Sequence, residues 1–296
     1  MMPGSARSRR PGLGECGGFY GLPRLRDELD LFAGDVPAML DAPAAIAGAY
    51  QISDDAFLLS LPSGLSFYYR RGIGTTYRRS AETTDDEIAL FFDGWVVGAI
   101  AWLNGYVPLH ASAVLHDGRI FAFTGHSGAG KSTLAAALAQ RGMTLCSDDV
   151  LLLDVADPAQ IIALPGPERI KLWDDALTLT GHRSVHPVRP GIRKFYVSGL
   201  SFACTPHPVR RLYFLESRAE AATGFTAIEG ASRFNWMRSA FYRPRLFTAI
   251  AEQAGYFQMG VRLSRSVEMR RFNRSRDHSR FNAGIDMISA DIRAAA

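Results

Sequence analysis

The feature that most constrains this chain is a glycine-rich segment followed by a lysine and two hydroxyl residues. Residues 125–133 satisfy the pattern G-x-x-x-x-G-K-[ST] of phosphate-binding loops. Glycines let backbone N–H groups turn toward a phosphate, and the N-terminus of the next helix adds the positive end of its dipole. The sequence therefore predicts a nucleotide site, with ATP as the nucleotide. The predicted binding residues of the loop are Gly125, His126, Ser127, Gly128, Ala129, Gly130, Lys131, Ser132 and Thr133.

The segments around this loop provide the strand–loop–helix context that the motif requires. Residues 110–115 and 119–124 have the pattern of two strands on either side of Asp117-Gly118, a strong hairpin signal. Residues 131–141 are rich in alanine and leucine and end before Gly142, which predicts a helix. Short strands should follow at 143–146 and 150–153. We therefore expect an α/β P-loop catalytic domain over residues 106–260.

The remainder of the chain divides into three predicted segments. Residues 1–20 are basic and glycine-rich, which predicts a disordered N-terminus. Strand signals and a helix start at Thr84 predict a small β-rich lobe over residues 21–105, ending in a helix. A free strand edge between residues 49 and 79 would let a peptide add to its sheet. Residues 261–296 form an arginine-rich C-terminal segment, which we interpret as a solvated helix face rather than a nucleic-acid site.

Two adjacent aspartates follow the loop closely. Asp148 and Asp149 lie seventeen and eighteen residues after Lys131, with one predicted helix and one strand between. They should therefore return to the sheet edge that carries the loop. Phosphoryl transfer to a hydroxyl needs a carboxylate to accept the proton, and a carboxylate also helps to hold magnesium. We expect Asp148 and Asp149 to be catalytic, and Ser132 and Asp149 to be the Mg²⁺ ligands.

Further charged residues are weaker candidates. His110, at the start of the predicted hairpin, can hydrogen-bond an aspartate or a phosphate, although a structural role is equally consistent with the sequence. Arg193 lies in a proline- and glycine-containing loop over residues 187–194 and can stabilise the charge of a transferring phosphoryl group, with a plain surface turn as the alternative. Glu168 and Lys171 lie in another predicted loop that can face the site, where Glu168 would be a further metal ligand.

Residues 109–114, the glycine loop and residues 146–150 together resemble the catalytic domain of the HPr kinase/phosphorylase family. The resemblance is greatest to small HPr-kinase-like proteins, some of which phosphorylate lasso-peptide precursors. It implies a fold related to phosphoenolpyruvate carboxykinase, with Asp149 as the base, Asp148 paired with His110, and Ser132 on magnesium. His126 stands where the bifunctional enzymes usually have aspartate. The resemblance leaves open whether this chain also removes phosphate.

The leading hypothesis from the sequence is a serine kinase that acts on a small protein or peptide. The alternatives are a nucleotide-binding regulatory module with little kinase activity, and a small-molecule kinase. The partner would be a peptide or protein with an acceptor serine, and the sequence leaves open a homo-oligomer. The C-terminal arginines lack the interleaved aromatics of single-strand readers, which argues against nucleic acid. Three widely spaced cysteines and the lack of a long apolar run favour a cytoplasmic protein without a membrane segment.

Overall fold

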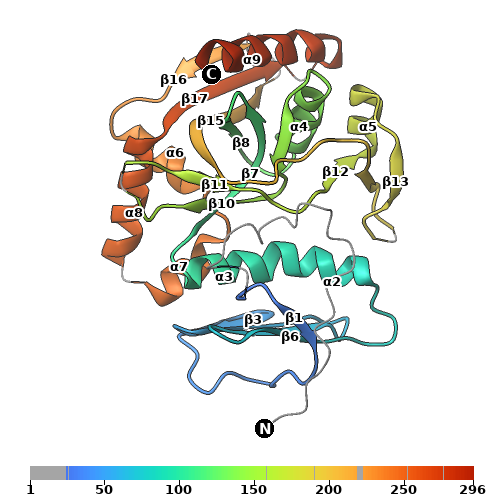
Figure 1. The fold of residues 1–296 in the computed structure, drawn as a ribbon, viewed down its shortest axis with the longest axis vertical. Helices are drawn as coiled ribbons and strands as arrows, with labels where there is room; N and C mark the ends of the chain where they lie inside the picture. The colour runs from blue at the N-terminus through green and yellow to red at the C-terminus, as the bar shows by residue number, and fades with distance from the viewer. Residues whose placement is uncertain are drawn as a thin grey trace.

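The computed structural model describes residue 25 and residues 27–157, 159–189, 191–218, 223–251, 253–275 and 277–296. The protein is a mixed α/β structure, in which a helical segment separates a smaller N-terminal sheet from a larger sheet with further helices (Figure 1). The predicted disordered segment, residues 1–20, lies outside the described residues. Within the described part of the chain, no helix is both long and apolar enough to cross a membrane.

The N-terminal sheet has six strands in the order β1-β6-β5-β4-β3-β2. The strands are β1 (Leu31–Ala33), β2 (Ala45–Ala47), β3 (Tyr50–Ile52), β4 (Ala56–Ser60), β5 (Ser66–Arg70) and β6 (Gly74–Arg78). Strands β4 and β5 alternate in side-chain direction, and their Phe57, Phe67 and Tyr69 are fully buried. Every strand between residues 49 and 79 is paired on both sides. The expected free edge in that range is therefore wrong, because β1 and β2 are the outer strands.

The segment between the two sheets is helical throughout. It comprises α2 (Asp85–Phe91), the π-helical turn η2 (Phe92–Val96) and α3 (Val97–Leu103). Thr84 caps its start as expected, since its hydroxyl accepts a 3.2 Å hydrogen bond from the N–H of Glu87. All residues of α3 are buried. The segment therefore joins the two sheets through one shared core, which runs from Leu25 to Met269.

The larger sheet contains eight strands and carries the glycine loop. Its main path is β11-β10-β7-β8-β15-β17-β16, and β9 pairs with β7. The strands are β7 (Val107–His116), β8 (Arg119–Thr124), β9 (Thr144–Ser147), β10 (Val150–Asp154), β11 (Ile162–Leu164), β15 (His207–Arg218), β16 (Gly224–Ala227) and β17 (Glu268–Ser275). The hairpin predicted around Asp117-Gly118 joins β7 to β8, and both turn residues have positive φ angles (47° and 71°). Strand β8 is apolar on both faces because each face packs against a separate part of the core.

Helices cover both faces of this sheet, and a small third sheet flanks it. The helices are α4 (Lys131–Ala139), α5 (Asp174–Thr180), α6 (Ser232–Ala240), α7 (Pro244–Ile250), α8 (Gln253–Ser266) and α9 (Phe281–Ala295). The third sheet has the order β12-β14-β13, with β12 (Ile170–Trp173), β13 (Ser184–Pro187) and β14 (Lys194–Val197). Buried side chains of α4 and α9 pack on the same core cluster, on one face of the sheet. This arrangement places α4, α5 and α9 around the glycine loop (Figure 1).

Two expectations from the sequence are corrected by the fold. Residues 268–275 are an inner strand of the large sheet, between β15 and β16, so this part of the arginine-rich segment is not a solvated helix face. Strand β17 therefore belongs to the same sheet as β8, the strand that leads into the glycine loop. Cys146 is buried and free, whereas Cys204 is disulfide-bonded. A disulfide is uncommon in the reducing cytoplasm that the cysteine spacing favoured.

Candidate active site

The glycine loop connects the end of β8 to the start of α4. Gly130 is the N-cap of α4 and has a φ of 82°, in the left-handed region that favours glycine. Gly125 has a φ of 149°, and a Cβ atom there would lie 2.8 Å from the carbonyl oxygen of Leu215 on β15. Only glycine fits at both positions. The loop conformation is therefore set jointly by its own residues and by the neighbouring strand.

Lys131 is held inside this loop. Its side chain is buried, and Nζ donates hydrogen bonds to the carbonyl oxygens of Gly125 (3.0 Å) and His126 (3.3 Å). Burial lowers the pKa of the Lys131 ammonium group, and the charges of Asp149 and Asp148 partly oppose that shift. The loop thus holds a largely desolvated cation, which a bound anion would stabilise.

Asp148 connects the loop helix to two neighbouring strands. Its Oδ1 accepts hydrogen bonds from the hydroxyl groups of Ser112 (2.7 Å) and Ser132 (2.6 Å). Its Oδ2 accepts a 3.2 Å hydrogen bond from the backbone N–H of Lys171. Since β7, α4 and β12 each contribute one donor, the position of this carboxylate is strongly constrained. Its oxygen lies directly beside the hydroxyl group at the first turn of α4.

Asp149 has a different environment from its neighbour. Its Oδ1 lies 3.4 Å from Nδ1 of His110, and its Oδ2 lies 3.4 Å from Nζ of Lys171. Burial raises the pKa of the Asp149 carboxyl, but the hydrogen bond from His110 and the positive charge of Lys171 outweigh this effect and hold the pKa well below its usual range. The residue has a φ of 76°, an uncommon conformation for a residue other than glycine. Asp149 is thus held ionised in a strained position beside the loop.

The structure therefore changes two of the expected pairings. His110 contacts Asp149, both through the carboxylate and through a 3.2 Å contact of Nδ1 with the backbone oxygen, and not Asp148 as expected. Ser132 contacts Asp148 and not Asp149. The reason is that adjacent residues at a bend direct their side chains to different sides. Asp148 points to the start of α4, and Asp149 points to β7 and β12.

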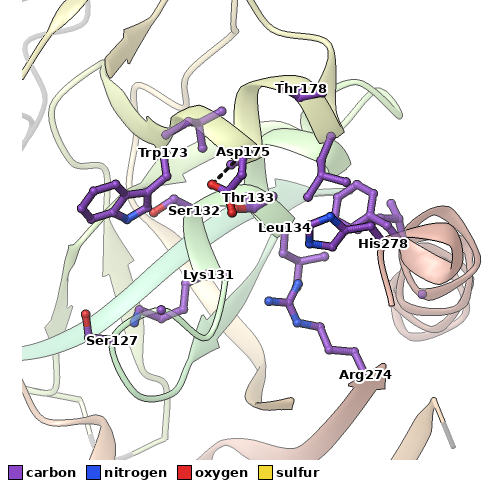
Figure 2. A pocket seen from close by; sticks show the side chains of 18 of the residues that line it. Ser127, Lys131, Ser132, Thr133, Leu134, Trp173, Asp175, Thr178, Arg274 and His278 are labelled. Carbon is purple, nitrogen blue, oxygen red and sulfur yellow. Dashed lines mark hydrogen bonds between the residues drawn. The ribbon is translucent and has the colours of Figure 1, made fainter. Parts of the chain in front are cut away.

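A cavity of about 1090 Å³ lies over the loop and brings most of the predicted residues together. Among the predicted residues, those that line it are His110, His126, Ser127, Gly128, Gly130, Lys131, Ser132, Thr133, Asp149 and Arg193. Gly125, Ala129 and Asp148 lie behind this surface. Figure 2 shows Lys131, Ser132 and Thr133 at the start of α4, with Trp173 and Asp175 on one side and Arg274 and His278 on the other.

Arg193 and Glu168 are less closely associated with the site. Arg193 lines the cavity, but its side chain is 80 % exposed and forms an ion pair with Asp174. Glu168 is not among the lining residues. Within the described residues, no cluster of three or more histidine, cysteine or acidic side chains could hold a metal ion.

Sequence reasoning missed two residues of the site and underestimated a third. Ser112 hydrogen-bonds Asp148, and it lies two residues after His110 on β7, so the two-residue period of a strand could have revealed it. Lys171 lies on strand β12 rather than in a loop, and it pairs with Asp149. Arg274 comes from β17, and no local pattern connects it to the loop.

Comparison with known proteins adds little to this site. No family model and no curated protein sequence matches the chain. Among solved structures, the chain is similar to the HPr(Ser) kinase/phosphatase from Coxiella burnetii, with 15 % sequence identity and a TM-score of 0.33. The match covers 63 % of this chain and 88 % of that chain. Because this likeness is low, the function has to be argued from the residues of the site.

Proposed function

We propose that this protein is an ATP-dependent serine kinase with a P-loop domain of the HPr-kinase-like type. It would transfer the γ-phosphate of Mg-ATP to a serine hydroxyl of a small protein or peptide. One observation carries the proposal: an ionised carboxylate, Asp149, and the loop cation Lys131 line the same cavity. A phosphate site alone would suit any nucleotide-binding protein. A carboxylate facing the same space supplies the group that phosphoryl transfer to a hydroxyl requires.

The loop residues bind the nucleotide in this proposal. Backbone N–H groups of residues 128–133 and the N-terminus of α4 would hold the phosphate chain. Lys131 is positioned by two loop carbonyl groups, so its ammonium group needs no large movement to meet phosphate oxygens. The cavity continues past α4 to apolar side chains of α5 and α9, among them Leu179 and Ile285, which would accept the base.

The residues around Ser132 fit a magnesium ion. Mg²⁺ prefers oxygen ligands, keeps several waters and is commonly held by one or two carboxylates together with substrate phosphates. The Ser132 hydroxyl and an Asp148 oxygen lie 2.6 Å apart, so they offer two such ligands on one side of the loop. We therefore assign the ion to Ser132 and Asp148. When bound, it would neutralise charge on the β- and γ-phosphates.

Asp149 would act on the acceptor. The serine oxygen forms a bond to the γ-phosphorus, the bond between that phosphorus and the oxygen of the leaving ADP breaks, and the hydroxyl proton passes to an Asp149 oxygen. His110 and Lys171 keep Asp149 ionised and fix its orientation before the acceptor arrives. Because charge in this reaction develops mainly on the phosphoryl group, a carboxylate with a low pKa serves mainly to orient the hydroxyl and to accept its proton late.

The remaining partner assignments are also proposals. The outer strands β1 and β2 of the N-terminal sheet are the edges on which an extended peptide could add. We place the protein in the cytoplasm, where ATP and magnesium are abundant. Neither membrane nor nucleic acid is required by this chemistry.

The test of this function compares Asp149→Asn with the wild-type protein. Both are incubated with γ-³²P-labelled Mg-ATP and three acceptor types: HPr, serine-containing peptides and free amino acids. We expect labelled protein or peptide with the wild type and none with Asp149→Asn, while ATP affinity changes little. Asp54→Asn, which alters an exposed carboxylate of the N-terminal sheet, is the matched control.

Equal transfer by Asp149→Asn would contradict the proposal. Labelled amino acid alone would indicate a small-molecule kinase, and tight ATP binding without any product would indicate a regulatory module.

A further inference from the structure

The arginines of β17 differ in how their charges are balanced. Arg270 forms a 2.5 Å ion pair with Asp291 of α9, and Arg271 forms a 2.7 Å ion pair with Glu216 of β15. Both guanidinium groups therefore have carboxylate partners within the sheet and its covering helix. These ion pairs neutralise two of the three arginines of β17.

Arg274, near the end of the same strand, has no such partner. Its Nη2 donates a 2.5 Å hydrogen bond to the carbonyl oxygen of Ala129 in the glycine loop. Among the described residues, it forms no ion pair with a carboxylate, and its buried Nε has no hydrogen-bond partner. Burial lowers the pKa of the Arg274 guanidinium, and no acidic neighbour opposes that shift. Among the described residues, the group is thus a partly desolvated cation without a paired carboxylate.

The position of Arg274 links it to the loop. Its guanidinium lines the cavity and points toward the start of α4 (Figure 2). A Cβ atom at position 130 would overlap with that guanidinium. Gly130 is therefore needed both for its φ angle and for the close approach of Arg274. Two segments far apart in the chain meet at this point.

Physical chemistry indicates what this cation is for. Removing a charge from water is costly unless an ion of opposite sign or strong hydrogen bonds compensate. One carbonyl group compensates a guanidinium only in part, since four of its five N–H donors remain for other acceptors. Its planar fork matches two oxygens of a phosphate group. The loop that it touches presents N–H groups and a helix N-terminus, which also bind anions.

We infer that Arg274 binds the phosphate chain of the nucleotide together with the glycine loop. This inference rests on the proposed function. Arg274 contacts the loop at Ala129 and Gly130, whereas Asp149 faces His110 and Lys171. Arg274 therefore contacts the phosphates away from the reacting end, and it contributes to affinity for ADP as well as ATP. It is a binding residue and not a source of the proton transfer.

The test measures ligand affinity in Arg274→Gln. ADP and inorganic tripolyphosphate are titrated into the wild type and the variant by calorimetry, and the melting temperature of each ligand-free protein is recorded. Loss of a charge-assisted contact should weaken both ligands by about 10- to 100-fold. The ligand-free melting temperature should stay the same or rise, because an unpaired, partly buried charge is removed. Arg265→Gln, at an exposed position on α8, removes the same charge and should change neither affinity.

Two results would overturn the inference. One is unchanged affinity of Arg274→Gln for both ligands. The other is a lower ligand-free melting temperature with no selective loss of phosphate binding, which would mean that Arg274 only fastens β17 to the loop. If the wild type binds neither ligand, the proposed function itself fails, so the two failures are distinguishable.

Discussion

The hydroxyl of Ser132 donates a 2.6 Å hydrogen bond to Asp148, sixteen residues further along the chain. This contact joins the first turn of α4 to the bend between β9 and β10, and it leaves Asp149 free to face His110 and Lys171. Two adjacent carboxylates thereby acquire separate environments. One lies at the oxygen-rich start of the loop helix, and the other lies between two nitrogen-bearing side chains. The proposed division of roles between metal ligand and base follows from this difference.

The first prediction separates the two carboxylates by their effect on magnesium. Asp148→Asn removes the negative charge beside Ser132, so magnesium should no longer increase the affinity for ATP. We expect the same dissociation constant in Mg²⁺ and in EDTA for this variant, measured by calorimetry. Asp149→Asn is the matched control and should retain the magnesium effect. If magnesium increases the affinity for ATP in Asp148→Asn but not in Asp149→Asn, the metal ligand is Asp149 and not Asp148.

The second prediction concerns acid stability. The pKa of Asp149 is held below its usual range in the folded protein, so its ionised form stabilises the fold at pH values above the unfolded pKa of about 3.9. That contribution is lost as the pH falls further through the folded pKa. Asp149→Asn should therefore be less stable than the wild type at pH 7. The difference in the free energy of unfolding between the two proteins should shrink as the pH falls below the unfolded pKa. Urea unfolding at several pH values checks this, and a difference that grows on acidification would contradict it.

The third prediction tests the packing between the helical segment and the loop before α7. A Cβ atom at Gly98 would lie 2.8 Å from the ring of Tyr242, so Gly98→Ala overpacks the core. The cost should be about 1–3 kcal/mol. Gly255, in α8, has open space around it, and Gly255→Ala should stabilise the protein by about 0.5–1 kcal/mol. Chemical denaturation of both variants measures the contrast, and a destabilised Gly255→Ala with an unaffected Gly98→Ala would refute the packing argument.

The fourth prediction compares a buried and an exposed ion pair. Arg211, only 4 % exposed, pairs with Glu268 at 2.9 Å and with Asp291 at 2.5 Å. Arg211→Met should cost about 3 kcal/mol, because two partly buried acids lose their buried partner. Arg70 pairs with Asp55 at 3.5 Å, and both side chains are 51 % exposed. Arg70→Met should cost less than about 1 kcal/mol. Similar costs for the two variants, measured by urea unfolding, would show that the buried network does not stabilise the sheet.

Local patterns predicted the parts of the fold that depend on neighbours in the chain. The Asp117-Gly118 hairpin, the helix after the glycine loop and the Thr84 helix start all lie where the sequence placed them. The π-helical turn at residues 92–96 and the strand formed by residues 268–275 were not predicted. The arginine-rich composition of β17 indicated exposure, but its charges are balanced by acids from α9 and β15, which lie far away in the sequence.

By itself, the sequence determined a phosphate-binding loop followed closely by two carboxylates, because the nine loop residues and the aspartate pair carry their chemistry in short, contiguous stretches. Only the tertiary structure decided which carboxylate meets which partner. Asp148 and Asp149 are equivalent in a sequence pattern, and the positive φ of Asp149 directs their side chains apart. Arg274 likewise joins the loop only because β17 pairs with β15 beside it. Such contacts depend on packing between distant segments, which no local pattern encodes.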